Sequence, residues 1–238
     1  MFLLAIIFKG RSPVTFPLVV FDLDGTLIDT APDLVASLNH TIAALDLAPV
    51  GYEDLTHLVG HGAQAMIESA CRLRGHPLTP EALPPLLERL VAFYTDTMPG
   101  DSKPFPGVIA AMDALKANGF KLAICTNKME SLATTLIAKL ELTHYFDAIT
   151  GGDTFAVRKP EAQHLIGTVE RAGGKLDRTV MIGDSLNDML VARNAGVPSI
   201  AVPFGYSDVA VETLGPSHII AHFDELTPDL VEGLLARA

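Results

Sequence analysis

The 238-residue sequence predicts an α/β fold: a doubly wound, mainly parallel Rossmann-like sheet that carries an inserted all-helical segment. Three observations support this prediction. Short, continuously apolar runs recur along the chain, as in strands that are buried on both faces of a parallel sheet. Helical patterns separate these runs. Residues 31–98 show helical periodicity without any strand signal.

The predicted sheet contains six apolar runs, at residues 18–22, 121–125, 148–150, 179–182, 199–202 and 218–220. The helices predicted between them span residues 107–118, 129–140, 160–172 and 185–195. Three of these helices are followed directly by a glycine, at Gly119, Gly173 and Gly196, and one begins with Pro160. Glycine just past a helix and proline at its first position are normal end signals.

The helical segment at residues 31–98 follows the first strand. Its apolar stripes are Leu34, Leu38, Ile42 and Leu45 in one helix, and Leu83, Leu87, Leu90 and Tyr94 in another. The Pro- and Gly-rich tract MPGDSKPFPG then leads back to the sheet, as a linker should. We therefore expect an N-terminal extension at residues 1–17, an α/β core at 18–30 and 99–238, and a helical unit at 31–98.

The composition limits the classes of function. A net charge of −11 argues against a non-specific nucleic-acid binder, which needs a basic face. The same charge means that a small anionic substrate needs a cation or local positive groups to receive it. The two cysteines, Cys71 and Cys125, have no metal-ligand spacing, and together they predict a reducing, cytoplasmic environment. The apolar run in the N-terminal extension is too short to span a bilayer and lacks the features of a secretory signal.

Polar side chains follow four of the predicted strands, where open α/β sheets place their ligand crevice. They are Asp22 and Asp24 after the first strand, Thr126 and Asn127 after the second, Lys159 after the third, and Asp184 and Asp188 after the fourth. Four aspartates can share a crevice only if a cation neutralises them, and Mg²⁺ fits best because it prefers oxygen ligands. Lys159, Thr126 and backbone amides at helix starts would then receive a phosphoryl group.

Plainer interpretations exist for these residues when each is considered alone. Asp22 and Asp24 precede a glycine, a sequence that is common in turns. Thr126 suits a helix N-cap, a role that is compatible with phosphate binding. Asp188 suits the first turn of a helix, where the helix dipole favours a negative charge.

Taken together, the residues favour a different interpretation. The combination of a cation site, an anion receptor and a free carboxylate favours phosphoryl transfer to an aspartate nucleophile.

The segments DLDGT, TN, KP and GDSLND, in this order, resemble the four motifs of the haloacid dehalogenase-like superfamily. The resemblance extends from residue 18 to the C-terminus. The helical segment directly after the first motif resembles the cap of the C1 members. Within them, LVGHGAQAMI, FPGV and especially GGDTFAVRKP resemble bacterial phosphoglycolate phosphatases.

The resemblance implies a role for each matching residue. Asp22 would attack phosphorus and form an aspartyl-phosphate, and Asp24 would protonate the leaving alkoxide and then deprotonate water. Mg²⁺ would be held by Asp22, the backbone carbonyl of Asp24 and Asp184, with Asp188 in support. The residues implied in phosphate binding are Thr126 and Lys159, with Asn127 as a further candidate.

The implied function is a Mg²⁺-dependent phosphomonoesterase that hydrolyses 2-phosphoglycolate to glycolate and phosphate. The superfamily also includes dehalogenases, but Asp24 favours phosphoryl chemistry, since carbon–halogen displacement needs no acid for an alkoxide. A pyrophosphatase, a nucleotidase, a sugar phosphomutase and a non-enzymatic phosphate-binding module stay open as alternatives. We expect a small phosphorylated substrate, no nucleic-acid or membrane partner, and a monomer or homodimer.

Overall fold

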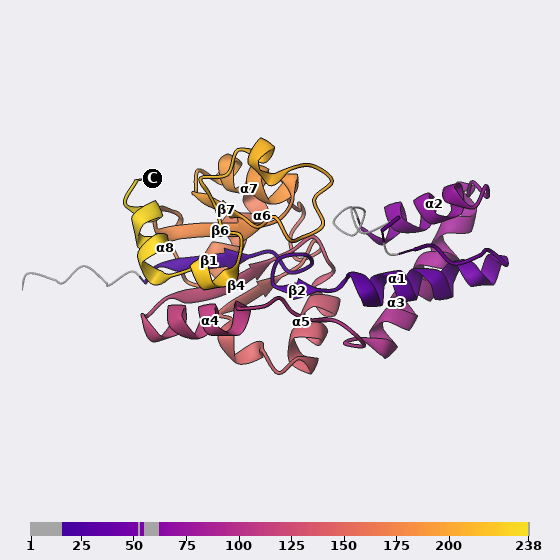
Figure 1. Cartoon of the computed structure of the whole chain (residues 1–238), viewed down its shortest axis with the longest axis horizontal. Helices are drawn as coiled ribbons and strands as arrows, with labels where there is room; N and C mark the ends of the chain where they lie inside the picture. The colour runs from indigo at the N-terminus through magenta and orange to yellow at the C-terminus, as the bar shows by residue number, and fades with distance from the viewer. Residues whose placement is uncertain (1–15, 52, 55–61, 238) are drawn as a thin grey trace, which may run out of the picture.

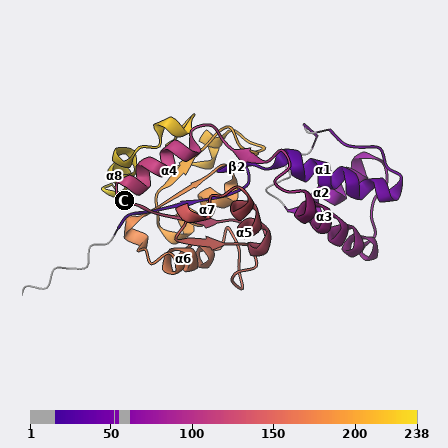
Figure 2. The same ribbon diagram turned by 90° about the horizontal axis from the view of Figure 1, so that it is seen from below.

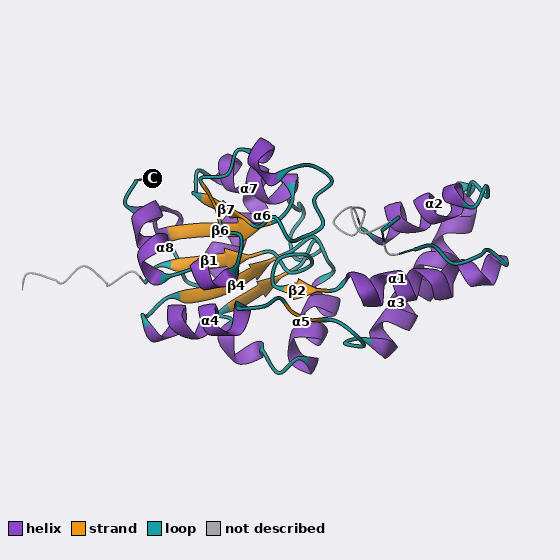
Figure 3. Ribbon diagram, in the orientation of Figure 1, coloured by secondary structure: helices purple, strands orange, loops and turns teal. Residues whose placement is uncertain are grey.

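The core of the protein is a parallel β-sheet. The computed structural model describes residues 16–51, 53–54 and 62–237, so the expected N-terminal extension lies almost entirely outside the described residues. The sheet has six strands in the order β5-β4-β1-β6-β7-β8, and each neighbouring pair is parallel. Figure 3 shows β4, β1, β6 and β7 side by side. The strands are β1 (Leu18–Phe21), β4 (Lys121–Cys125), β5 (Ala148–Thr150), β6 (Thr179–Gly183), β7 (Ser199–Ala201) and β8 (His218–Ile219).

Helices cover both faces of this sheet. On β1, Val19 and Phe21 pack in one hydrophobic cluster, whereas Leu18 and Val20 pack in another, because successive side chains point to opposite faces. The first cluster includes α4 (Val108–Ala117), α5 (Glu130–Lys139) and α8 (Pro228–Leu235), and the second includes α6 (Ala162–Arg171) and α7 (Leu186–Ala195). Figure 2 shows α4 and α8 on the side of the sheet opposite α6. The predicted doubly wound α/β fold is therefore confirmed.

A second group of helices lies beyond one end of the sheet (Figure 1). It consists of α1 (Ala31–Ile42), α2 (Ala63–Leu73) and α3 (Leu83–Thr97), and each of them contacts the other two. The interior includes Leu34, Leu38 and Ile42 of the expected stripe in α1. In α3 the buried residues are Leu86, Leu90 and Tyr94, whereas the expected Leu83 and Leu87 are only partly buried. We call these three helices the helical unit.

Two linkers join the helical unit to the sheet, and they pair with each other. Strands β2 (Ile28–Asp29) and β3 (Lys103–Pro104), which are too short to be predicted from sequence, form an antiparallel pair. The buried carboxylate of Asp33 at the start of α1 accepts hydrogen bonds from the Asp101 amide at 2.7 Å and the Ser102 hydroxyl at 2.5 Å. These contacts fix the outgoing and returning chains side by side.

The Tyr206 hydroxyl anchors the first linker to the loop after β7. It accepts hydrogen bonds from the Thr30 amide at 2.7 Å and the Ala31 amide at 2.9 Å, and it donates to Asp29 Oδ1 at 2.7 Å. Burial raises the pKa of Tyr206 above its usual value, and the hydrogen bond to Asp29 adds to this effect. The phenol therefore stays protonated and can keep its donor role.

The order of strands and helices agrees with the sequence prediction, with small differences. Helix α6 begins at Ala162 rather than at Pro160, because Glu161 before it has an extended backbone, with ψ of 126°. Helix α8 was not predicted. Among the helices of the described residues, none combines the length and apolarity that crossing a bilayer requires.

Candidate active site

The predicted site residues converge because the strands that carry them are neighbours. Strand β1 pairs with β4 on one side and with β6 on the other, all in parallel, so their carboxyl ends meet at one edge of the sheet. Asp22 follows β1, Thr126 follows β4, and Asp184 follows β6. Lys159 reaches the same place from the loop between β5 and α6.

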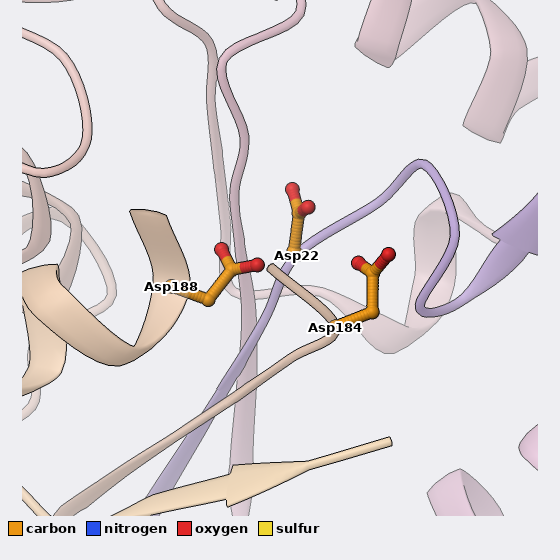
Figure 4. Close-up of side chains that lie close together, drawn as sticks. All are labelled: Asp22, Asp184 and Asp188. Atoms are coloured by element: carbon orange, nitrogen blue, oxygen red, sulfur yellow. The ribbon is translucent and has the colours of Figure 1, made fainter. Parts of the chain in front are cut away.

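Three carboxylates form a buried acidic cluster at this edge (Figure 4). One oxygen from each of Asp22, Asp184 and Asp188 lies within 4.8 Å of the others. All three side chains are buried. Such a set of oxygen ligands suits Mg²⁺, which binds carboxylates and keeps part of its shell for water and phosphate. The donor set of the site therefore fits the metal that the sequence predicted.

The cluster carries more negative charge than its protein partners neutralise. Burial raises the pKa of Asp22 from 3.8 to about 7, with Lys159 opposing the rise and Asp188 adding to it. Burial also raises the pKa of Asp184, to about 8, and the charges of Asp188 and Asp22 push it further. A divalent cation would lower both pKa values, because it stabilises the ionised carboxylates.

Lys159 is the cation within this cluster. Its Nζ lies 2.6 Å from Asp188 Oδ1, to which it donates a hydrogen bond, and 2.8 Å from Asp22 Oδ1, an ion pair without hydrogen-bond alignment. Its side chain is 2% exposed. Burial alone would lower the pKa of Lys159, but the charges of Asp188 and Asp22 raise it above its usual value. Lys159 is therefore permanently charged beside Asp22.

Two neighbours hold the loop that carries Lys159. The backbone amide of Lys159 donates to His164 Nδ1 at 3.1 Å, and its carbonyl accepts from Asn127 Nδ2 at 3.1 Å. Burial lowers the pKa of His164 to about 4, and the charge of Lys159 adds to this effect, so the ring stays neutral and its Nδ1 stays an acceptor. The amide nitrogen of Asn127 is thus committed to the loop, which makes Asn127 a support for Lys159.

Asp188 and Asp184 are each held by further hydrogen bonds. Asp188 Oδ2 accepts from the amide and hydroxyl of Ser185, at 3.0 and 2.6 Å, so Asp188 also closes a capping box at the start of α7. Asp184 Oδ1 accepts from the Thr26 hydroxyl at 2.9 Å, and Oδ2 accepts from the Tyr206 amide at 2.7 Å. Gly25 has a φ of +81°, and a Cβ there would lie 2.6 Å from Asp184 Oδ2, so only glycine fits this turn.

Asp24 lies outside the acidic cluster and has a separate set of partners. Its Oδ1 accepts from the Thr30 hydroxyl at 2.6 Å and from Lys128 Nζ at 3.0 Å. The side chains of Asp24 and Lys128 are 13% and 6% exposed. The two aspartates of DLDGT therefore differ in environment: Asp22 faces Lys159 and the cluster, whereas Asp24 faces Lys128 and the linker.

Thr126 is buried and does not cap a helix. Helix α5 has Met129 as its N-cap, so the N-cap interpretation of Thr126 is wrong. Its Oγ1 instead accepts a hydrogen bond from the Lys128 amide at 3.2 Å. No hydrogen bond donated by the Thr126 hydroxyl is present among the described residues, so this proton is available to an acceptor in the site.

The comparisons with known proteins assign the family. The family model for haloacid dehalogenase-like hydrolases matches residues 19–202, which include the acidic cluster, Thr126 and Lys159. The chain belongs to the haloacid dehalogenase-like hydrolases. It is 58% identical over 221 residues to a phosphoglycolate phosphatase of Agrobacterium fabrum, with 93% of this chain and 95% of the relative covered. A phosphoglycolate phosphatase of Mesorhizobium japonicum is 48% identical, with 93% and 98% covered.

Solved structures agree with this family assignment. A predicted phosphoglycolate phosphatase from Haemophilus somnus aligns with a TM-score of 0.82 and 25% identity, covering 93% of this chain and 99% of that one. A putative phosphatase from Clostridium difficile, at 20% identity and a TM-score of 0.76, shows the same fold. Both solved structures thus share the architecture of this chain.

Lys128 and Tyr206 are two of the residues near this haloacid dehalogenase-like site that the sequence did not single out; Thr26 and Thr30 are two others. Lys128 directly follows Thr126 and Asn127, so its place in the second motif was the available signal. Tyr206 carries no such signal, because it lies in a loop after β7. The predicted roles of Asp22, Asp24, Thr126, Asn127, Lys159, Asp184 and Asp188 stay predictions.

Proposed function

We propose that this hydrolase is a Mg²⁺-dependent phosphomonoesterase that hydrolyses 2-phosphoglycolate to glycolate and phosphate through an aspartyl-phosphate. The observation that carries the proposal is the different environments of Asp22 and Asp24. Asp22 stands in the acidic cluster beside Lys159, where a nucleophile and a phosphate receptor belong. Asp24 has its own hydrogen-bond partners outside the cluster, as an acid–base group needs. Curated relatives bear the name phosphoglycolate phosphatase.

Mg²⁺ would be bound by Asp22 and Asp184, with Asp188 in support and the backbone carbonyl of Asp24 as a further ligand. When bound, the metal neutralises charge on the phosphoryl oxygens and on the carboxylates. Asp188 already accepts from Lys159 and Ser185, so its main contribution is to orient these groups and to add charge. The ion pair between Lys159 and Asp22, at 2.8 Å, favours the ionised form of the nucleophile and limits the rise in its pKa that burial causes.

The first half-reaction forms the covalent intermediate. A carboxylate oxygen of Asp22 attacks phosphorus, and the bond between phosphorus and the ester oxygen breaks. The leaving glycolate oxygen takes the proton of Asp24. Lys159 and the free hydroxyl proton of Thr126 stabilise the negative charge of the phosphoryl oxygens during the transfer, as fixed positive groups do in phosphoryl transfer.

The second half-reaction regenerates the enzyme. Asp24, now ionised, removes a proton from a water molecule, and the water oxygen attacks phosphorus. The bond between phosphorus and Asp22 breaks, and phosphate leaves. The Thr30 hydroxyl, 2.6 Å from Asp24 Oδ1, fixes the orientation of the carboxylate in both steps.

We assign the helical unit, at residues 31–98, the role of a cap that closes over this edge of the sheet and excludes water. Tyr94 of α3 supports the assignment, because its ring lies against Lys128, whose Nζ is 4.5 Å from the ring centroid. We also place the protein in a reducing cytoplasm, since Cys71 and Cys125 are both free and buried.

A phosphate-release screen tests the function. The wild-type protein is assayed with and without Mg²⁺ on small phosphomonoesters, nucleotides, pyrophosphate and hexose 1-phosphates. We expect Mg²⁺-dependent release that is most efficient with 2-phosphoglycolate. Asp22→Asn should lose activity by a factor of about 10³ or more, because its amide cannot attack phosphorus.

Two results would contradict the proposal. Isomerisation of hexose phosphates without release of phosphate would indicate a mutase. An Asp22→Asn variant that keeps most of the Mg²⁺-dependent activity would exclude Asp22 as the nucleophile. Asp113→Asn is the matched control, because Asp113 lies in α4 and its Oδ1 accepts a hydrogen bond from Tyr145 outside the site.

A further inference from the structure

Lys128 is a buried cation next to the acid–base group. Its side chain is 6% exposed, and Asp24 is its only ion-pair partner among the described residues. An ammonium group has three N–H donors. Only one of them has a hydrogen-bond acceptor in the part of the chain that the structure describes, namely Asp24 Oδ1 at 3.0 Å. A buried ammonium with unused donors is costly unless a ligand completes its partners.

The backbone of Lys128 is fixed, so its side chain has a defined reach. The amide donates to Thr126 Oγ1 at 3.2 Å, and the carbonyl accepts from the Gly152 amide at 2.8 Å. Gly152 itself has no room for a side chain, because a Cβ there would lie 2.5 Å from the Asn127 carbonyl oxygen. Lys128 therefore presents its ammonium from a rigid loop that also carries Thr126.

Tyr94 of the helical unit supplies a second, independent observation. Its ring lies under Lys128 Nζ, at 4.5 Å from the ring centroid, and the residue is 1% exposed. Its hydroxyl is buried, lies close to Lys128 and has no well-aligned hydrogen-bond partner among the described residues. Burial raises the pKa of Tyr94, and the nearby charges of Lys128 and Asp24 act on it in opposite directions. The phenol is thus a protonated donor close to both side chains.

The positions of the two buried lysines match the two ends of the proposed substrate. Lys159 faces Asp22, where the phosphoryl group is attacked. Lys128 faces Asp24, which acts on the leaving oxygen. In 2-phosphoglycolate one carbon separates the ester oxygen from the carboxylate, so a leaving oxygen at Asp24 brings the carboxylate within the neighbourhood of Lys128. Charge-assisted hydrogen bonds of this kind are strong and favour one orientation.

We propose that Lys128, with the Tyr94 hydroxyl, binds the carboxylate of the leaving group, so that this chain selects phosphate esters bearing a carboxylate next to the ester carbon. This inference rests on the proposed phosphatase function and assigns its leaving-group specificity. Lys128 belongs to the α/β core and Tyr94 to the helical unit. The substrate carboxylate would therefore contact both the α/β core and the helical unit. Its binding would favour the closed arrangement, in which Lys128 and Tyr94 lie next to each other.

The test compares two esters that differ only in charge, 2-phosphoglycolate and its neutral amide, 2-phosphoglycolamide. For the wild type we expect kcat/KM to favour the carboxylate by at least about 30-fold, as for a charge-assisted hydrogen bond. Lys128→Met should reduce this preference to within about threefold. Lys116→Met is the matched control, since it removes the same charge from an exposed ion pair with Asp147 and should keep the preference.

Folding of the variants is checked by circular dichroism. If Lys128→Met does not fold, Lys128→Gln serves, because its side chain keeps an N–H donor near Asp24 while it lacks the charge. Tyr94→Phe, which deletes only the unpartnered hydroxyl, should raise the KM for 2-phosphoglycolate. An unchanged KM would remove Tyr94 from the carboxylate site.

The outcomes separate the inference from the function on which it rests. A wild type that prefers 2-phosphoglycolate, with a folded Lys128 variant that keeps the preference, would overturn the inference and leave the phosphatase function intact. If a Lys128 variant loses kcat/KM by the same factor on both esters, Lys128 acts only through Asp24. That result would also overturn the proposed carboxylate site. A wild type that hydrolyses neither ester would contradict the proposed function and, with it, the carboxylate site.

Discussion

Replacement of Lys159 by methionine is the perturbation whose consequences the structure predicts most fully. The substitution keeps most of the length of the side chain and removes its charge. It leaves Asp22, Asp184 and Asp188 within 4.8 Å of one another without the lysine that now pairs with two of them. Because the Lys159 side chain is only 2% exposed, solvent compensates little for the loss of its charge.

The size of the expected loss in stability follows from the burial of Lys159. Loss of one partner of a buried ion pair destabilises a protein by about 3–5 kcal/mol. For a chain of this length each kcal/mol lowers Tm by about 2–4 °C, so the Mg²⁺-free variant should unfold about 6–20 °C lower. The loss should be larger at pH 8 than at pH 5, because Asp22, whose pKa is about 7 in the folded protein, is protonated at the lower pH.

The assay is thermal unfolding followed by circular dichroism, in EDTA and in Mg²⁺, at both pH values. Lys116→Met again is the control, because its side chain is 36% exposed and its ion pair should contribute less than about 1 kcal/mol. We also expect a loss of about 10²–10³ in kcat, as for removal of one group that stabilises transition-state charge. A Tm equal to that of the control, at either pH, would refute the reasoning.

Three further predictions concern the metal, the pH dependence and the linker. Asp184→Asn should abolish the rise in Tm that Mg²⁺ produces in the wild type, whereas Asp113→Asn should keep it, and an unchanged rise in Asp184→Asn would exclude this ligand. The folded-state pKa values of Asp22 and Asp184, about 7 and about 8 against 3.8 unfolded, mean that the metal-free folded state holds protons that the unfolded state has released. Its free energy of unfolding should therefore fall as the pH rises from about 4 to about 8, while Mg²⁺ affinity from calorimetry rises, and a flat profile for both would contradict these pKa values. Tyr206→Phe leaves the buried amides of Thr30 and Ala31 without an acceptor and should cost about 2–4 kcal/mol in urea unfolding, against about 1 kcal/mol for Tyr145→Phe, which loses one hydrogen bond to Asp113; equal costs would show that the linker contact is unimportant.

Much of the fold could be predicted because the central strands β1 and β6 are buried on both faces. Residues 18–21 and 122–125 are continuously apolar, and both segments lie in central strands of the observed sheet. Strands β2 and β3 could not be predicted, since each has two residues and forms only because the linkers run side by side. Helix α6 begins later than expected because local end signals do not reveal the extended turn after Lys159.

The candidate site could be predicted where its residues stand at strand ends, because parallel strands bring their carboxyl ends together. Asp22, Asp184 and Lys159 meet for this reason. The supporting contacts could not be predicted in the same way, because their partners lie in loops and linkers, whose positions the strand order does not determine. Lys128 reaches Asp24 across 104 residues, and the Tyr206 hydroxyl meets the Thr30 amide across 176 residues.

The proposed aspartyl-phosphate is tested most directly by trapping it. Asp24→Asn cannot activate water, and p-nitrophenyl phosphate needs no acid for its leaving group, so this pair should form the intermediate and fail to hydrolyse it. After acid quench and proteolysis, mass spectrometry should find the mass of one phosphoryl group on the peptide that contains Asp22. A burst of p-nitrophenol equal to the enzyme concentration should accompany it. Steady turnover without phosphorylated Asp22, or a phosphoryl group on another residue, would contradict the mechanism.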